Sequence, residues 1–196
     1  MSIPEIKVTL LGDVGVGKTS LLHRFIKDDF LSDPSSSLTI DIGRKDIQCN
    51  SKKVCFVFQD TKGFESIGSY IPTSLFRSAE CVIFVYDLSD LDSLETLQSW
   101  KKKLDNFVET YVSILVGNKL DLIGERFKGD LLDRAIRTTN SKQSFQVSAK
   151  SGVGCEDILQ FLVETFHKRG CDTLTQSVNL NIPNTTQPIK VCCSLS

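Results

Sequence analysis

A glycine-rich stretch at residues 12–19 reads Gly-Asp-Val-Gly-Val-Gly-Lys-Thr. Glycines at this spacing let successive backbone N–H groups turn inward, and such a row of donors binds phosphate oxygens. An apolar run precedes the stretch and a helix-compatible segment follows, so the positive end of that helix adds to the attraction for anions. Lys18 can reach β- and γ-phosphate oxygens, and the Thr19 hydroxyl can bind Mg²⁺. The pattern predicts a phosphate-binding loop that uses Asp13, Val14, Gly15, Val16, Gly17, Lys18, Thr19 and Ser20.

Two further polar segments, Asn118-Lys119-Leu120-Asp121 and Ser148-Ala149-Lys150, each follow an apolar run that is typical of a strand. Ligands collect at the carboxyl ends of parallel strands, so both segments can meet the phosphate loop in one crevice. Asp121 can accept the N1–H and the exocyclic amine of guanine, and the Asn118 amide can address O6 and N7. Adenine would leave the carboxylate unpaired, which is costly in a closed site. The segments therefore predict a guanine site, although without the phosphate loop they would be ordinary polar turns.

Together with Asp60-Thr61-Lys62-Gly63, these motifs make the chain resemble the Ras superfamily of small GTPases over about residues 5–168. Residues 75–79 and 84–89 and paired terminal cysteines resemble the Rab branch more than Ras or Rho. Trp100 also falls where Rab proteins have tryptophan, and packing on a helix explains it adequately. The resemblance implies a monomeric GTP/GDP switch in vesicle and membrane trafficking, with Mg²⁺ as cofactor. It also implies effectors, an exchange factor, an activating protein, and escort and GDP-dissociation-inhibitor proteins as partners.

The resemblance assigns further site residues. Thr19, Ser37 and Asp60 would hold Mg²⁺, with Thr39 as the alternative to Ser37 in the first switch. Phe30 would stack on the base, and the Gly63 backbone N–H would contact the γ-phosphate. Lys18 and Gly63 would then stabilise the charge that develops during phosphoryl transfer. Residues 38–46 and 64–76 would be the two switch regions.

Three positions depart from the family pattern. Phe64 stands where the family has its water-orienting glutamine, and phenylalanine has neither donor nor acceptor for that task. Val14 adds bulk beside the γ-phosphate, where the resemblance implies that valine hinders hydrolysis. Gln59 replaces a tryptophan that most Rab proteins have. We expect slow GTP hydrolysis, with a constitutively GTP-loaded scaffold as the alternative.

Strand and helix patterns alternate along the chain. Strands are predicted at residues 7–11, 40–48, 54–59, 81–86, 113–116 and 144–147, and helices at residues 17–27, 68–78, 93–107, 130–138 and 156–168. The second and third strands are joined by a short polar turn and indicate an antiparallel hairpin at one edge. The prediction is an α/β fold, a P-loop NTPase G domain with a six-stranded, mixed but mostly parallel sheet and helices on both faces. This domain would span residues 1–170.

Composition favours a cytosolic setting. A net charge of −1 gives no electrostatic case for nucleic acid. No apolar run approaches the roughly 20 residues of a membrane span, and the N-terminus lacks the pattern of a signal peptide. Seven cysteines, an odd number without zinc-site spacing, suit a reducing compartment.

The tail at residues 171–196 is polar, almost uncharged and without periodicity, which predicts a flexible tether. It ends Cys192-Cys193-Ser194-Leu195-Ser196, so Cys193 is the fourth residue counted from the end, as prenylation requires. An isolated box of this kind would suit a farnesyl group, whereas the likeness to Rab tails implies double geranylgeranylation of Cys192 and Cys193. One lipid gives only marginal membrane binding, which favours two. We therefore expect the protein on the cytoplasmic face of an intracellular membrane, cycling with the cytosol.

Overall fold

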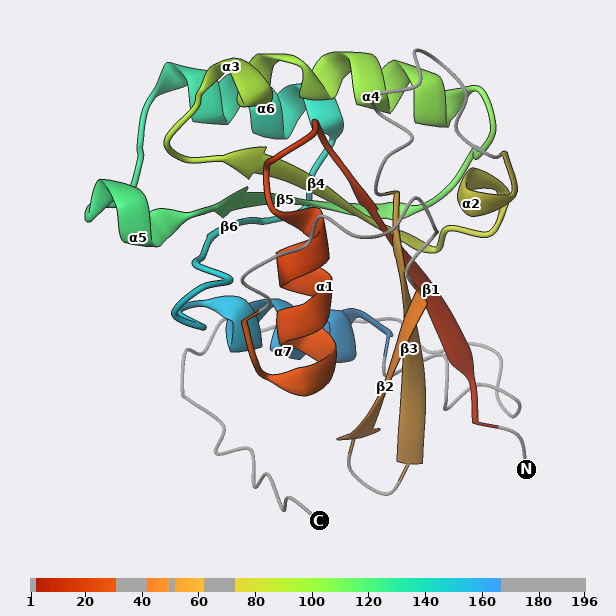
Figure 1. The fold of residues 1–196 in the computed structure, drawn as a ribbon. Coiled ribbons are helices and arrows are strands. Elements are labelled where there is room, and N and C mark those ends of the chain that lie inside the picture. Colours follow the sequence, from red (N-terminus) through yellow and green to blue (C-terminus); the bar gives the residue numbers. More distant parts are fainter. Residues whose placement is uncertain (1–2, 31–41, 50–51, 62–72, 167–196) are drawn as a thin grey trace, which may run out of the picture.

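The computed structural model describes residues 3–30, 42–49, 52–61 and 73–166. Within them the chain forms a six-stranded sheet in the order β2-β3-β1-β4-β5-β6 (Figure 1). Neighbouring strands are parallel except for β2 and β3, which pair antiparallel at one edge. This confirms the predicted mixed, mostly parallel sheet. The strands are β1 (Glu5–Leu11), β2 (Ile42–Cys49), β3 (Lys52–Asp60), β4 (Cys81–Asp87), β5 (Val112–Asn118) and β6 (Ser144–Gln146).

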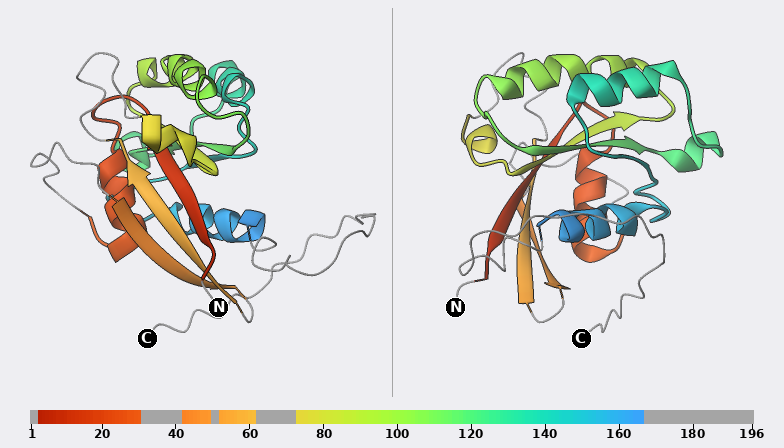
Figure 2. Two further views of the ribbon diagram at one scale, coloured as in Figure 1. Left: turned by 90° about the vertical axis from the view of Figure 1, so that its right-hand side faces the viewer. Right: turned by 180° about the vertical axis from the view of Figure 1, so that it is seen from behind.

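Helices cover both faces of the sheet, as the two views of Figure 2 show. One face carries α1 (Lys18–Lys27) and α7 (Cys155–Phe166), and the other carries α2 (Thr73–Arg77), α3 (Asp92–Glu95), α4 (Leu97–Asp105) and α6 (Asp130–Thr139). The short α5 (Leu120–Ile123) directly follows β5. Every residue of β4 is buried, as expected for a central parallel strand with helices on both sides.

Alternate residues of β4 divide between two apolar cores. Ile83 and Val85 face the core that contains Phe25 of α1 and Leu162 of α7. Phe84 lies in the other core, which α2, α3, α4 and α6 close. The period-two alternation of a strand therefore builds both layers from one short segment.

The helix predicted at residues 93–107 differs from the structure, which has two helices separated at Thr96. The Thr96 hydroxyl donates to the Ser93 carbonyl at 3.0 Å. A threonine side chain that bonds a carbonyl in the preceding turn competes with the helical pattern. The ψ of −20° at Thr96 is correspondingly typical of a 3₁₀ turn. The helix α5 was not predicted, because four residues carry no readable periodicity.

Several predicted features lie outside the described residues. These are the boundary at residue 170, the tail with Cys192 and Cys193, the first-switch candidates Ser37 and Thr39, and the second-switch positions Gly63 and Phe64. Residues 40–41 of the second predicted strand, 68–72 of the second predicted helix and 167–168 of the last one also lie outside. In the part that the structure does describe, no helix is both long and apolar enough to cross a membrane.

Candidate functional site

The predicted phosphate loop connects the end of β1 to the start of α1 (Figure 1). Two of its glycines are needed because other parts of the chain approach closely. Gly17 has φ of 93°, and a Cβ there would lie 2.3 Å from Asn118 Nδ2. A Cβ on Gly12 would lie 2.1 Å from the Val85 carbonyl oxygen. Larger residues would therefore push the loop away from β4 and from the end of β5.

Lys18 folds back over this loop. Its Nζ donates to the carbonyl oxygens of Gly12, at 3.0 Å, and of Asp13, at 2.7 Å. The side chain is buried, whereas a Cβ built on Gly15 at the crest would meet nothing within 4 Å. The loop thus combines a positive charge, the N-terminus of α1 and an open crest, which are the properties of an anion site.

Thr19 and Asp60 meet beside the loop. The Thr19 hydroxyl donates to Asp60 Oδ2 at 2.5 Å, although the two residues come from α1 and from the end of β3. The next residue, Thr61, donates its hydroxyl to the Leu10 carbonyl at 3.0 Å and so fixes the end of β3 against β1. A hydroxyl and a carboxylate are hard oxygen ligands of the kind that Mg²⁺ prefers, so these two residues fit that ion.

Asn118 joins the phosphate side to the base side. Its Nδ2 donates to the Val16 carbonyl at 3.0 Å, and its Oδ1 accepts the Ala149 N–H at 3.0 Å. The residue is 2% exposed. Both ends of the amide therefore hold loops together, a role that differs from the predicted contact with O6 and N7 of a base. That contact remains a prediction.

Asp121 and Ser148 bring the two base segments into contact. The Ser148 hydroxyl donates to Asp121 Oδ1 at 2.5 Å and accepts the Ser151 N–H at 3.0 Å. Asp121 itself is exposed. Its carboxylate is thus oriented by Ser148 yet accessible, and the predicted cost of leaving it unpaired would arise only when a base covers it.

Lys119 has a left-handed backbone, with φ of 66°, and its Nζ forms an ion pair with Asp87 Oδ2 at 2.6 Å. Burial raises the pKa of the Asp87 carboxyl, but hydrogen bonds from Lys119 and from Ser89 outweigh it, and the net pKa is lower than its ordinary value. The carboxylate at the end of β4 therefore stays charged and anchors Lys119.

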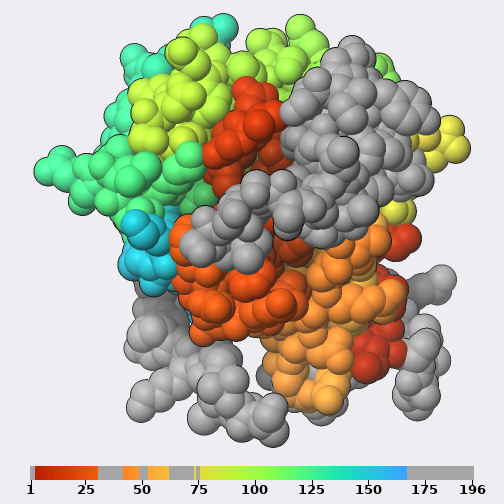
Figure 3. Space-filling view, viewed as in Figure 1, coloured from red at the N-terminus to blue at the C-terminus, as the bar shows by residue number. Residues whose placement is uncertain are grey.

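Two further residues of the predicted site, Phe30 and Val14, lie in the described part of the chain. Phe30 is half-buried, and its backbone N–H donates to Asp29 Oδ1 at 2.7 Å. Val14 is 62% exposed at the crest of the phosphate loop. In the space-filling view the red phosphate loop and the orange α1 lie on the same face as the green segment after β5 and the cyan segment after β6 (Figure 3).

Sequence reasoning missed two side chains that support these loops. Trp100 of α4 donates its indole N–H to Asp13 Oδ1 at 2.7 Å, so it does more than pack on a helix. Arg24 of α1 contacts the segment after β6. The sequence offered a signal for Trp100, because it occupies a position where Rab proteins have tryptophan. It offered none for Arg24, because the sequence of an amphipathic helix does not distinguish an arginine that binds another segment from one that faces solvent.

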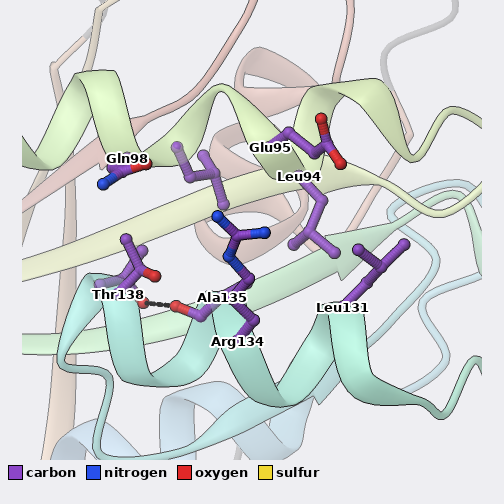
Figure 4. A pocket seen from close by; sticks show the side chains of 9 residues that line it. Leu94, Glu95, Gln98, Leu131, Arg134, Ala135 and Thr138 are labelled. Carbon is purple, nitrogen blue, oxygen red and sulfur yellow. Dashed lines mark hydrogen bonds between the residues drawn. The ribbon is translucent and has the colours of Figure 1, made fainter.

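A separate pocket of about 160 Å³ lies between α6 and the pair α3 and α4 (Figure 4). Leu94 and Leu131 line it together with the charged Glu95 and Arg134. The Thr139 hydroxyl on its wall donates to the Ala135 carbonyl at 2.7 Å within α6. None of the predicted site residues lines this pocket.

Comparison with known proteins agrees with this geometry. Residues 7–168 match the family described as the Ras family. The chain is 33% identical to Ras-related protein Rab-31 of Rattus norvegicus over 162 residues, 82% of each chain. It is 31% identical to Ras-related protein Rab-13 of Bos taurus, covering 95% of this chain and 90% of that protein. Ras-related protein Rab-10 of Diplobatis ommata is 30% identical, with 96% and 95% covered. The chain therefore belongs to the Ras family and is a divergent small GTPase of its Rab branch.

Proposed function

We propose that this protein is a Rab-type switch in vesicle and membrane trafficking that binds GTP and GDP with Mg²⁺ and hydrolyses GTP slowly. One observation carries the proposal: the Asn118 amide holds both the phosphate loop, through Val16, and the base segment, through Ala149. A single buried side chain thus keeps a phosphate cradle and a base site at a fixed separation.

Each part of the ligand then has its own protein groups. Lys18 and the loop from Asp13 to Ser20 would hold the phosphates, Asp121 would accept the guanine N–H groups, and Phe30 would stack on the base. Ser148, Ala149, Lys150 and Lys119 would shape the base site. Thr19 and Asp60 would hold Mg²⁺ with Ser37, or with Thr39 as the alternative. When bound, the ion neutralises phosphate oxygens.

The proposal of slow hydrolysis rests on Phe64 and Val14. Phosphoryl transfer to water requires a correctly placed water molecule and neutralised oxygens. Lys18 and the Gly63 N–H would supply neutralisation, but Phe64 cannot orient water. The exposed Val14 side chain adds apolar bulk at the open crest of the phosphate loop. The same two residues favour the alternative function, a pseudo-GTPase that stays GTP-loaded and recruits effectors to a membrane.

Membrane attachment is part of the proposal. Cys192 and Cys193 would carry the two prenyl groups, and the protein would cycle between an intracellular membrane and the cytosol as a monomer. Exchange factor, activating protein, effectors, escort protein and GDP-dissociation inhibitor are the expected partners. Mass spectrometry of the protein from native membranes should find a doubly prenylated C-terminal peptide, and an unmodified peptide there would exclude this anchor.

Single-turnover hydrolysis tests the catalytic proposal. Wild type loaded with GTP should hydrolyse it more slowly than about 10⁻⁴ per second, the lower end for ordinary small GTPases. Phe64→Gln should be roughly tenfold or more faster, because it restores a polar group that can place water. Phe64→Leu is the matched control, since it stays apolar and should remain slow. Equal rates in wild type and Phe64→Gln would show that Phe64 does not limit hydrolysis.

A further inference from the structure

Arg24 lies near the end of α1, about two turns from Lys18, and its guanidinium joins three backbone carbonyls. Nε donates to the Ala149 carbonyl at 2.9 Å, and a terminal nitrogen donates to the Lys150 carbonyl at 2.9 Å. The other terminal nitrogen donates to the Asp28 carbonyl at 2.7 Å. Only 12% of the side chain is exposed. One arginine therefore connects the end of α1 to the segment at residues 148–150.

Ala149 is held from two sides as a result. Its N–H donates to Asn118 Oδ1, and its carbonyl accepts from Arg24. The residue is 2% exposed, so a carbonyl that lost its donor would stay poorly hydrated. The adjacent Ser148 orients Asp121 through its hydroxyl. Arg24 of α1 thus contributes to the position of the Asp121 carboxylate through Ala149 and Ser148, although α1 is distant from these residues in the sequence.

Through α1, the contact of Arg24 with Ala149 and Lys150 connects the base segment to the phosphate loop. α1 runs from Lys18 to Lys27, begins at the phosphate loop and carries Arg24 one turn before its end. An α-helix rises about 1.5 Å per residue, so α1 holds Lys18 and Arg24 roughly 9 Å apart along its axis. We propose, on the basis of the function proposed above, that Arg24 is a positioning residue that holds segment 148–150 so that Ser148 and Asp121 recognise the 2-amino edge of guanine.

Arginine suits this task better than lysine. A guanidinium presents several N–H donors in a planar fork and can serve neighbouring carbonyls at once, whereas an ammonium acts as a point charge. The accompanying ion pair with Asp28 is long, at 3.5 Å, and the Asp28 side chain is 89% exposed. A long ion pair whose carboxylate lies in water contributes little. The hydrogen bonds to the backbone carbonyls, and not the ion pair, should therefore account for the effect of Arg24.

The test compares Arg24→Lys, Arg24→Gln and the control Asp28→Asn by stopped-flow release of fluorescent GDP. Competition by GDP and by IDP, which lacks the exocyclic amine, gives the base preference. Arg24→Lys should release GDP roughly tenfold faster, the effect of losing one charge-assisted hydrogen bond. It should also lower the preference for GDP over IDP. Asp28→Asn removes the ion pair, keeps all three backbone acceptors and should behave as wild type.

The outcomes separate the two proposals. Failure of folded wild type to bind GDP would overturn the proposed function. Tight binding by wild type with an unchanged release rate and an unchanged GDP preference in Arg24→Lys would overturn the role of Arg24 alone. A variant with a lower melting temperature but unaltered GDP preference would likewise show a structural residue only. If Arg24→Gln does not fold, Arg24→Lys decides, because it keeps the charge and the apolar stem.

Discussion

Two groups of residues around the same phosphate loop differ in how they keep to the family pattern. Apart from Val14, the described residues proposed to hold the nucleotide match it, and several of them, including Lys18, Thr19 and Asn118, form hydrogen bonds within or between the loops. The two residues that would govern hydrolysis, Val14 and Phe64, depart from it. On the proposed function, nucleotide binding would depend on contacts that connect three loops, whereas hydrolysis would depend on a few individual side chains. The second property can therefore change while the first is kept.

Burial gives the physical reason for this difference. Asn118 is buried and each end of its amide has a backbone partner, so a substitution would leave buried polar groups unpaired. Val14 is 62% exposed, and exposed substitutions usually change stability by less than about 0.5 kcal/mol. Folding stability therefore restricts substitution at Asn118, and it does not restrict substitution at Val14 on the crest of the loop.

The largest expected effect is on base recognition. Asp121→Asn replaces a pure acceptor with a group that also donates, so GDP should bind roughly 10³-fold more weakly or worse. XDP, whose base presents a carbonyl where guanine has its amine, should bind more tightly than GDP. Calorimetric titration with both nucleotides measures this. The exposed Asp133→Asn on α6 is the control, and equal loss of GDP and XDP affinity would contradict a specific contact with the base.

On the hydrolysis side we expect a smaller change from Val14→Ala. Removing apolar bulk at the crest should raise the single-turnover rate of GTP hydrolysis by about tenfold, with GDP affinity within about twofold of wild type. Val153→Ala, at a position that is also exposed, serves as the matched control. A fall in affinity without a gain in rate would break the separation of binding from hydrolysis.

Asp87→Asn tests whether the ion pair between Asp87 and Lys119 stabilises the protein, because the strength of that ion pair depends on pH. The folded pKa of Asp87 lies below the ordinary 3.8, so the ion pair contributes fully above that pH. Its contribution is lost as pH falls through the lower folded pKa. Urea unfolding at pH 7 should show Asp87→Asn to be less stable by about 1–3 kcal/mol. The difference in unfolding free energy between wild type and Asp87→Asn should become smaller below about pH 4. A difference that does not vary with pH would exclude the ion pair as its cause.

The smallest effect is expected for Trp100→Phe, which removes the indole donor to Asp13 but keeps an aromatic ring in the core. Loss of one hydrogen bond should speed GDP release by a few-fold, about 0.5–1.5 kcal/mol. A double-mutant cycle with Asp13→Ala measures the coupling. Additive effects of the two substitutions would show that the contact does not restrain the loop.

Trp100 is the only tryptophan of the chain, so its fluorescence reports on this contact directly. We expect the emission of wild type to change when GDP is released. In Asp13→Ala that change should be smaller, because the indole no longer contacts the loop.

Much of the fold was predictable because its signals are local. Glycines in the phosphate loop, the unbroken apolar run of β4 and the polar turn between β2 and β3 each indicate one structure with few alternatives. The break at Thr96 was not predictable, since a hydroxyl that bonds a carbonyl within its own turn leaves the apolar periodicity unchanged. Likewise, four residues of α5 are too few to show a period.

The candidate site divides in the same way. Spacing identified the loops, but it could not identify the contacts between them. Arg24 lies 125 residues from Ala149 in the sequence, and Trp100 lies 87 residues from Asp13. Such pairs depend on how α1 and α4 pack on the sheet. The left-handed backbone at Lys119, which directs its side chain to Asp87, was also invisible in a tetrapeptide motif.

The nucleotide carried by the freshly purified full-length protein, followed for several hours with Mg²⁺ present, tests the central claim most directly. We predict about one guanine nucleotide per protein, with bound GTP converting to GDP with a half-time of roughly two hours or longer, as expected for a rate below about 10⁻⁴ per second. GTP that persists unchanged would favour the scaffold over the switch. A folded protein that carries no nucleotide and binds neither GDP nor GTP when they are added would contradict the account.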